Sequence, residues 1–201
     1  ATNNEHKVRE IREMFETAMP GRIELLTLKD VLKEPVEVEE TGSTFEENAC
    51  LKAKSYYELT KIPCFADDSG LEVDILKGEP GIYSARYAGV QGEHPANRQK
   101  VLNLLGDIPL EQRTARFRAV ICYEDGRQTH TMEGSVEGKI IFEEKGAGGF
   151  GYDPIFVPDE YLEDSELTGK TFAEIPAPDK HRISHRGRAV QKLISFLKEK
   201  S

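Results

Sequence analysis

The sequence has no long apolar run. No stretch approaches the ~20 consecutive apolar residues that a membrane-spanning helix needs, and no apolar segment with a basic leader opens the chain. We therefore expect a protein with no membrane partner. The chain has 201 residues, of which 38% are apolar and 31% are charged. This length and composition are typical of a soluble enzyme with a substantial core.

Surplus positive charge is also absent. The chain carries 27 lysines and arginines against 36 acidic residues, which gives a formal net charge of −9. Binding to nucleic acid needs clustered Lys and Arg to replace the counterions of the phosphates, so this balance predicts no nucleic-acid partner. A small anionic ligand is compatible with the charge, because a few well-placed cations and a metal can bind it.

Cysteine is scarce. Cys50, Cys64 and Cys122 are odd in number, widely separated and without CxxC spacing. We interpret them as buried thiols in a reducing compartment, which predicts a cytoplasmic protein.

Repeats, linkers and low-complexity segments are missing as well, so we treat residues 1–201 as one domain. Hydrophobic spacing and capping residues predict helices over residues 5–19, 45–60 and 96–105 and from Ser184 onward. Apolar runs and alternation predict strands over residues 23–28, 35–39, 64–67, 115–123, 127–133, 135–142 and 155–157. Helices interleaved with strands predict an α/β fold with a mixed β-sheet flanked by helices.

Two adjacent acids, Asp67 and Asp68, stand at the end of a short apolar run and before Ser69-Gly70. We expect a strand that ends in a glycine turn, and ligands bind at such strand ends in α/β domains. Neighbouring carboxylates repel unless a cation compensates them, which favours Mg²⁺ together with phosphate. Asp, Ser and Gly are also ordinary turn formers, so a plain turn is the alternative.

The first residues combine short polar side chains, the start of a helix and Lys7. Free backbone N–H groups and the helix dipole favour an anion there, so the segment suits phosphate. The alternative is a plain helix cap. The GxxxxGK[ST] spacing of a P-loop is missing, which disfavours P-loop chemistry.

Two further segments suggest a metal and a flat ligand. Glu40 precedes a turn and a helix, where it is either a second metal ligand beside Asp68 or simply solvated. The loop with Gly146, Gly148, Gly149 and Gly151 carries Phe150 and Tyr152, whose rings could stack on a nucleobase. A glycine-rich loop without a ligand is the alternative.

A basic segment from Lys180 to Arg188 lies where the last helix is predicted to begin. Positive charge at a helix N-terminus opposes the dipole and favours a bound anion, although surface solvation also explains it. His181 and His185 have the i,i+4 spacing of a zinc pair, but no HExxH pattern is present.

Taken together, five segments closely resemble the inosine triphosphate pyrophosphatase family, which removes deaminated purine nucleoside triphosphates. They are TNNEHK, EETGSTFEENACLKA, FADDSGLEVD, GFGYDPIF and KHRISHRGRA, in the order of the family and over nearly the whole chain. The resemblance implies an elongated α/β fold of two lobes with a central cleft, in a homodimer. Family members have a strand before the first segment, so we expect that strand to be missing here.

The resemblance also implies a role for each matching residue. The triphosphate-binding segment would be Thr2, Asn3, Asn4, Glu5, His6 and Lys7. Glu40 and Asp68 would bind Mg²⁺, with Asp68 as the general base and Ser69 as a substrate contact. The base-binding residues would be Phe150, Gly151, Tyr152 and Asp153, with Lys180, His185 and Arg186 as the remaining nucleotide contacts.

The predicted activity is hydrolysis of ITP, dITP or XTP by water, giving the monophosphate and pyrophosphate. Asp67 or a hydroxide on the metal could replace Asp68 as the base. We expect donors from His185 and Arg186 to read the 6-oxo group of the purine. The alternatives are a nucleotide-binding regulator, a Nudix hydrolase, whose motif Arg9–Glu13 matches only in part, and a pyrophosphatase of the Maf type.

Overall fold

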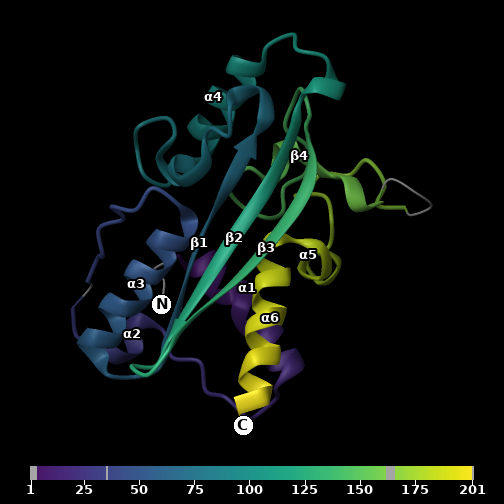
Figure 1. The fold of residues 1–201 in the computed structure, drawn as a ribbon. Helices are drawn as coiled ribbons and strands as arrows, with labels where there is room; N and C mark the ends of the chain where they lie inside the picture. Colours follow the sequence, from purple (N-terminus) through teal and green to yellow (C-terminus); the bar gives the residue numbers. More distant parts are fainter. Residues whose placement is uncertain (1–3, 35, 162–165, 201) are drawn as a thin grey trace. The chain divides into compact units, whose positions relative to one another are not determined.

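A computed structural model describes residues 4–34, 36–161 and 166–200, whose elements are labelled in Figure 1. Its backbone contacts divide the chain into two compact units. Unit 1 comprises Ala1–Asp68, Ala119–Gly134 and Arg186–Ser201, and unit 2 comprises Ser69–Arg118 and Ser135–His185. Strands β1, β2 and β3 each contribute residues to both units.

The described residues form an α/β fold, as predicted. Its helices are α1 (Glu5–Ala18), α2 (Leu28–Val31), α3 (Phe45–Thr60), α4 (His94–Leu105), α5 (Ala177–Ile183) and α6 (His185–Lys200). Its strands are β1 (Cys64–Val73), β2 (Thr114–Glu124), β3 (Thr129–Ile140) and β4 (Phe156–Pro158). They form one antiparallel sheet in the order β1-β2-β3-β4, with Ile140 of β3 opposite Phe156 of β4. None of the helices in these residues combines the length and apolar character that crossing a bilayer requires.

In unit 1, α1 and α6 share a core with one face of β2. Helix α1 begins at the cap residue Asn4, whose side chain accepts the backbone N–H groups of His6 and Lys7; such a cap stabilises a helix by about 1 kcal/mol. The core residues come from α1, β2, β3 and α6: Ile11, Met14, Phe15, Ala119, Ile121, Tyr123, Met132, Ala189, Val190, Leu193 and Ile194. The spacing of these residues fits helices and a strand that each bury one side here.

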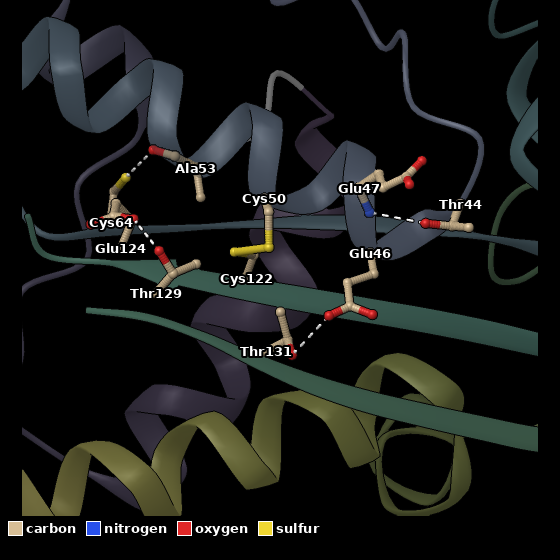
Figure 2. Close-up of a disulfide and its surroundings, with 10 residues drawn as sticks. All are labelled: Thr44, Glu46, Glu47, Cys50, Ala53, Cys64, Cys122, Glu124, Thr129 and Thr131. Carbon is tan, nitrogen blue, oxygen red and sulfur yellow. Dashed lines mark hydrogen bonds between the residues drawn. A yellow bond between two sulfur atoms is a disulfide. The ribbon is translucent and has the colours of Figure 1, made fainter.

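The other face of β2 in unit 1 is joined to α3 by a disulfide. Figure 2 shows Cys50 of α3 facing Cys122 of β2, with the bond between the helix and the strand. The prediction of three thiols is therefore wrong for this pair. Cys64 is a free thiol that donates to the carbonyl of Ala53, as predicted, but it is only partly buried. Sequence spacing could not reveal the pair, because the two residues are separated by 72 positions.

We expect loss of the Cys50–Cys122 bond to lower the free energy of unfolding by about 2–4 kcal/mol, because the bond restricts the unfolded chain. Urea unfolding of Cys50→Ala under non-reducing conditions measures this change. Cys64→Ala is the matched control, since it removes a cysteine that forms no disulfide. A Cys50→Ala protein as stable as the control, or a wild-type mass that equals the fully reduced chain, would contradict the prediction.

Unit 2 has its own core, built largely of aromatic and aliphatic side chains. Phe117 of β2 packs edge-on against Phe156 of β4 at 4.7 Å between ring centroids, and it also stacks on Phe172. Val101 and Leu105 bury one side of α4 in the same core. Helix α4 ends at Gly106, whose φ of +45° a residue with a side chain would adopt only under strain.

Four of the predictions differ from the structure. Residues 23–27 are not a strand, because Thr27 and Asp30 form a capping box that begins α2 at Leu28. The expected turn at Gly70 is wrong: β1 continues to Val73, since Leu71 and Val73 are buried in the unit 2 core. The two predicted strands over residues 127–133 and 135–142 are the single strand β3. Residues 36–39 are not assigned to a strand, and residue 35 lies outside the described residues.

Candidate active site

Asp67 is buried in the middle of β1 and is held by two cations within unit 1. Its Oδ2 lies 3.1 Å from Nζ of Lys7 and 3.3 Å from Nε of Arg186. Arg186 also places Nη1 at 2.6 Å from Oε2 of Glu10. The exposed fractions of the Asp67 and Arg186 side chains are 1% and 3%, so water screens this network little.

These contacts set the charge states of the network. Burial alone would raise the pKa of Asp67, but the charges of Lys7 and Arg186 outweigh burial and hold the pKa below its ordinary value. Burial lowers the pKa of Lys7, which Asp67 opposes. Burial would also lower the pKa of Arg186, yet Glu10 and Asp67 raise it above its ordinary value. These shifts favour the charged forms of Asp67 and Arg186, whose ion pair is the ionised centre of the network.

Asp68, the next residue, belongs to a second set of contacts in unit 1. Nζ of Lys52 lies 3.0 Å from Oδ1 of Asp68 and 2.6 Å from Oε1 of Glu40. The two acids predicted to share a metal therefore meet at one cation. Nδ2 of the buried Asn48 donates to Oδ2 of Asp68 at 3.4 Å.

The local sequence explains why this set assembles. Thr44 caps α3 by accepting the N–H of Glu47, and Asn48 and Lys52 then lie four residues apart on one side of the helix. Oδ1 of Asn48 accepts the N–H of Gly42 at 2.8 Å. A Cβ atom at Gly42 would lie 2.7 Å from that oxygen, so only glycine allows this close approach between the Glu40 segment and α3.

At both Asp68 and Lys52, burial and the charge of the other residue shift the pKa in opposite directions. Burial raises the pKa of Asp68, and the charge of Lys52 only partly opposes this. For Lys52, burial lowers the pKa, but Asp68 and Glu40 outweigh it and raise the pKa above its ordinary value. In the described part of the chain, no group of three or more His, Cys, Asp and Glu side chains is arranged to hold a metal ion.

Only part of the predicted phosphate-binding segment can be located. Thr2 and Asn3 lie outside the described residues, and Asn4 is the cap of α1. Glu5 and His6 belong to the first turn of α1, where the backbone N–H of His6 donates to Asn4. Lys7 is the residue of this segment that reaches a predicted site acid, through its ion pair with Asp67.

In unit 2, the predicted base-binding residues surround a buried ion pair. Nζ of Lys180 lies 2.8 Å from Oδ2 of Asp153, and that oxygen also accepts the N–H of Phe150 at 2.7 Å. The Lys180 ammonium lies 5.3 Å from the centre of the Phe150 ring. Tyr152 is 4% exposed and packs in the core, so it offers no open ring face, whereas the Phe150 side chain is only partly buried.

The basic segment is arranged differently from the prediction. Lys180, His181 and Arg182 lie in the last turn of α5, where positive charge is favourable to the helix dipole. Ser184 separates α5 from α6, so His181 and His185 do not form an i,i+4 pair on one helix. The spacing of these two histidines therefore gives no support to a zinc site, which the missing HExxH pattern already disfavoured.

The three remaining predicted contacts lie in or beside β1 and α6. Ser69 follows Asp68 in β1. The His185 ring is buried and stacks on Phe117 at 4.7 Å between ring centroids. The described ion pairs of Arg186 are with acidic side chains, so its contact with the purine of the substrate stays a prediction.

A family model described as the Ham1 family matches residues 1–196 of the chain. The chain belongs to the Ham1 family. Two curated relatives, from Desulforamulus reducens and Bacillus subtilis, are each named dITP/XTP pyrophosphatase. Both are 46% identical to this chain over 198 residues, which cover 98% of it and 93% and 94% of the relatives, respectively.

Solved structures of Ham1 proteins resemble this Ham1 chain throughout. The Ham1 protein of Staphylococcus aureus matches with a TM-score of 0.85 and 39% identity, over 100% of this chain and 97% of that one. The Ham1 protein of Coxiella burnetii matches with a TM-score of 0.84 and 34% identity, over 99% of this chain and 96% of that one.

Two site residues of this Ham1 chain were missed by the sequence analysis. Lys52 joins Glu40 to Asp68, and Asn48 contacts both Asp68 and the Gly42 backbone. Their position in the helix could have revealed them, because both polar side chains lie on the same helix as the apolar residues Ala49 and Ala53. A lysine on a side that is otherwise buried needs an acidic partner, which would have pointed to Glu40 or Asp68.

Proposed function

We propose that this chain hydrolyses deaminated purine nucleoside triphosphates, such as ITP, dITP and XTP, to the monophosphate and pyrophosphate. The observation that carries the proposal is the meeting of Glu40 and Asp68 at Lys52, beside a second acid, Asp67, that holds Lys7. Such a mixture of acids and lysines suits a polyphosphate with a divalent cation. The names of the curated relatives support the same activity.

We propose Mg²⁺ as the metal and Glu40 and Asp68 as the residues that would hold it. Both carboxylates lie within 3.0 Å of one Nζ atom, so their oxygens can serve one cation. Two carboxylates together with substrate phosphates form a donor set that Mg²⁺ commonly takes. When bound, Mg²⁺ supplies positive charge that neutralises the phosphate oxygens.

The acids and lysines of the two contact networks in unit 1 then have roles in our proposal. Asp68 orients the attacking water and accepts its proton. Asp67 is the weaker candidate for this base, because its Oδ2 is held by Lys7 and Arg186. The lysines Lys7 and Lys52 neutralise oxygens of the triphosphate, and charge stabilisation of this kind supplies much of the rate in phosphoryl transfer.

Residues of unit 2 are proposed to recognise the base. The Phe150 ring would stack on the purine, and the backbone N–H groups of Gly151 and Tyr152 together with His185 would donate to its 6-oxo group. Adenine presents an amino group at this position and would leave buried donors unpaired, which strongly disfavours it.

The domain organisation, the oligomeric state and the cellular location are also part of the proposal. We propose one domain that acts as a homodimer in the cytoplasm, where its nucleotide substrates are made. Because cytoplasmic thiols are kept reduced, the Cys50–Cys122 bond is the observation that weighs against this location. Thiol alkylation of protein quenched directly from cells measures how much of the pair is oxidised there.

A panel of eight nucleoside triphosphates, each with Mg²⁺ and pyrophosphate detection, tests the substrate class. We expect ITP, dITP and XTP to be cleaved at least about 100-fold faster than ATP, because a site of fixed donors rejects a base that leaves them unpaired. GTP, which shares the 6-oxo group, should also be cleaved slowly. Similar rates on all eight substrates would reject the proposal, and tight binding without product would favour a regulator.

A further inference from the structure

The loop over residues 146–153 in unit 2 is held by the N–H of Gly148, which donates to the carbonyl of Ala173 at 3.0 Å, and by three further described contacts. At its end, Asp153 joins the N–H of Phe150 to Lys180 through the same oxygen, Oδ2. The hydroxyl of Tyr152 donates to the carbonyl of Ser84 at 2.8 Å. The third anchor comes from α4: Nη1 of Arg98 donates to the carbonyl of Gly151 at 2.8 Å.

The Arg98 anchor is itself fixed by an acid. Nη2 of Arg98 lies 2.9 Å from Oε2 of Glu144, and Nε lies 2.8 Å from Oε1 of the same residue. The hydrogen bond from Nη2 to Glu144 and the one from Nη1 to Gly151 together orient the guanidinium group. The exposed fraction of the Arg98 side chain is 12%, against 41% for Glu144, so Arg98 is the more buried partner of the pair.

Gly151 is a position of the loop with wide conformational freedom. Its φ is +64°, and a Cβ atom built on it would meet nothing within 4 Å. Phe150 precedes it and Asp153 follows two residues later. Release of the Gly151 carbonyl would therefore loosen the segment between the Phe150 ring and the Asp153 contact.

We propose that Arg98 is a positioning residue that holds the Gly151 carbonyl and thereby keeps residues 150–153 in the conformation that receives the purine. This inference rests on the proposed function. Arg98 touches neither the phosphates nor the reacting atoms in this scheme. By holding the loop before binding, Arg98 lowers the conformational entropy that is lost when the nucleotide binds. Loss of Arg98 therefore raises KM and weakens the discrimination between bases, and it leaves the chemical step unchanged.

Arg98→Met tests the proposal, because methionine keeps an unbranched apolar side chain but loses every donor. We expect its KM for ITP to rise about tenfold with kcat within about twofold of wild type, and the ratio of kcat/KM for ITP over GTP to fall. Hydrogen exchange of the backbone amides of residues 146–153, measured without nucleotide, should become faster in that segment alone. Arg98→Lys keeps one donor and should give intermediate values.

Arg116→Met is the matched control. Nε of Arg116 contacts both carboxylate oxygens of Glu137 at 3.1 and 3.0 Å, so this variant also loses a paired arginine of unit 2. Its contacts are to Glu72, Asp74 and Glu137 and not to the loop. We expect kinetics and loop exchange equal to those of wild type.

Three outcomes would overturn the inference. In the first, Arg98→Met retains the wild-type KM, selectivity and loop exchange. In the second, its kcat falls while KM is unchanged. In the third, exchange rises throughout unit 2, which would mean a structural role only. If wild-type protein does not cleave ITP, the proposed function fails separately, and the exchange comparison still decides whether Arg98 holds the loop.

Discussion

Asp68→Asn should lower kcat for ITP on the order of 10³-fold in the presence of Mg²⁺. The substitution removes one of the two carboxylates that meet at Lys52 and leaves no base at this position. Asparagine keeps the size, and its single carbonyl oxygen can still accept from Lys52 while the hydrogen bond from Asn48 is lost, so the fold should be retained. Steady-state kinetics measure the loss of turnover, and a thermal melt followed by circular dichroism checks the fold.

The control for this loss is Asp74→Asn, which removes an aspartate of unit 2. Asp74 is 42% exposed and pairs with Arg116, away from the residues assigned to substrate. It should turn over ITP at the wild-type rate. Turnover by Asp68→Asn within tenfold of wild type would remove Asp68 from the mechanism and leave the choice of base open.

Asp67→Asn should lower the free energy of unfolding by about 3–5 kcal/mol, because it leaves two buried cations without their shared anion. Lys7 and Arg186 both contact Oδ2 of Asp67, so both would lose this partner. Urea unfolding of the variant and of wild type at neutral pH measures the difference.

The same Asp74→Asn variant is the control for the loss of stability expected of Asp67→Asn. Its ion pair with Arg116 is partly exposed to water, and such pairs contribute about 0–1 kcal/mol. In the double variant Asp67→Asn/Arg186→Met one of the two cations that faced Asp67 is removed as well, so its loss of stability should be smaller than the sum of the single losses. Equal stability of Asp67→Asn and Asp74→Asn would contradict the ionised network described for unit 1.

Much of the secondary structure followed from local sequence. The cap residue Asn4, the capping residue Thr44 and the Asp125-Gly126 turn each mark the end of an element that the structure contains. These signals act over a few residues, so no tertiary contact is needed to interpret them. The family could likewise be inferred from five ordered motifs.

The capping box of Thr27 and Asp30 is a local signal that was missed, whereas other missed features depend on contacts between distant residues. Gly70 has the composition of a turn, yet β1 passes through it because Leu71 and Val73 are buried in the unit 2 core. The meeting of Glu40, Lys52 and Asp68 joins three segments of the chain, and no local pattern specifies that geometry. The Cys50–Cys122 bond and the Arg98 contact with Gly151 are long-range for the same reason.

The most direct test of the central claim is a phosphorus NMR spectrum of ITP during turnover by the wild-type protein with Mg²⁺. The proposed cleavage between the α and β phosphates predicts resonances of inosine monophosphate and pyrophosphate that grow together in equal amounts. Growth of inosine diphosphate and orthophosphate instead would contradict it.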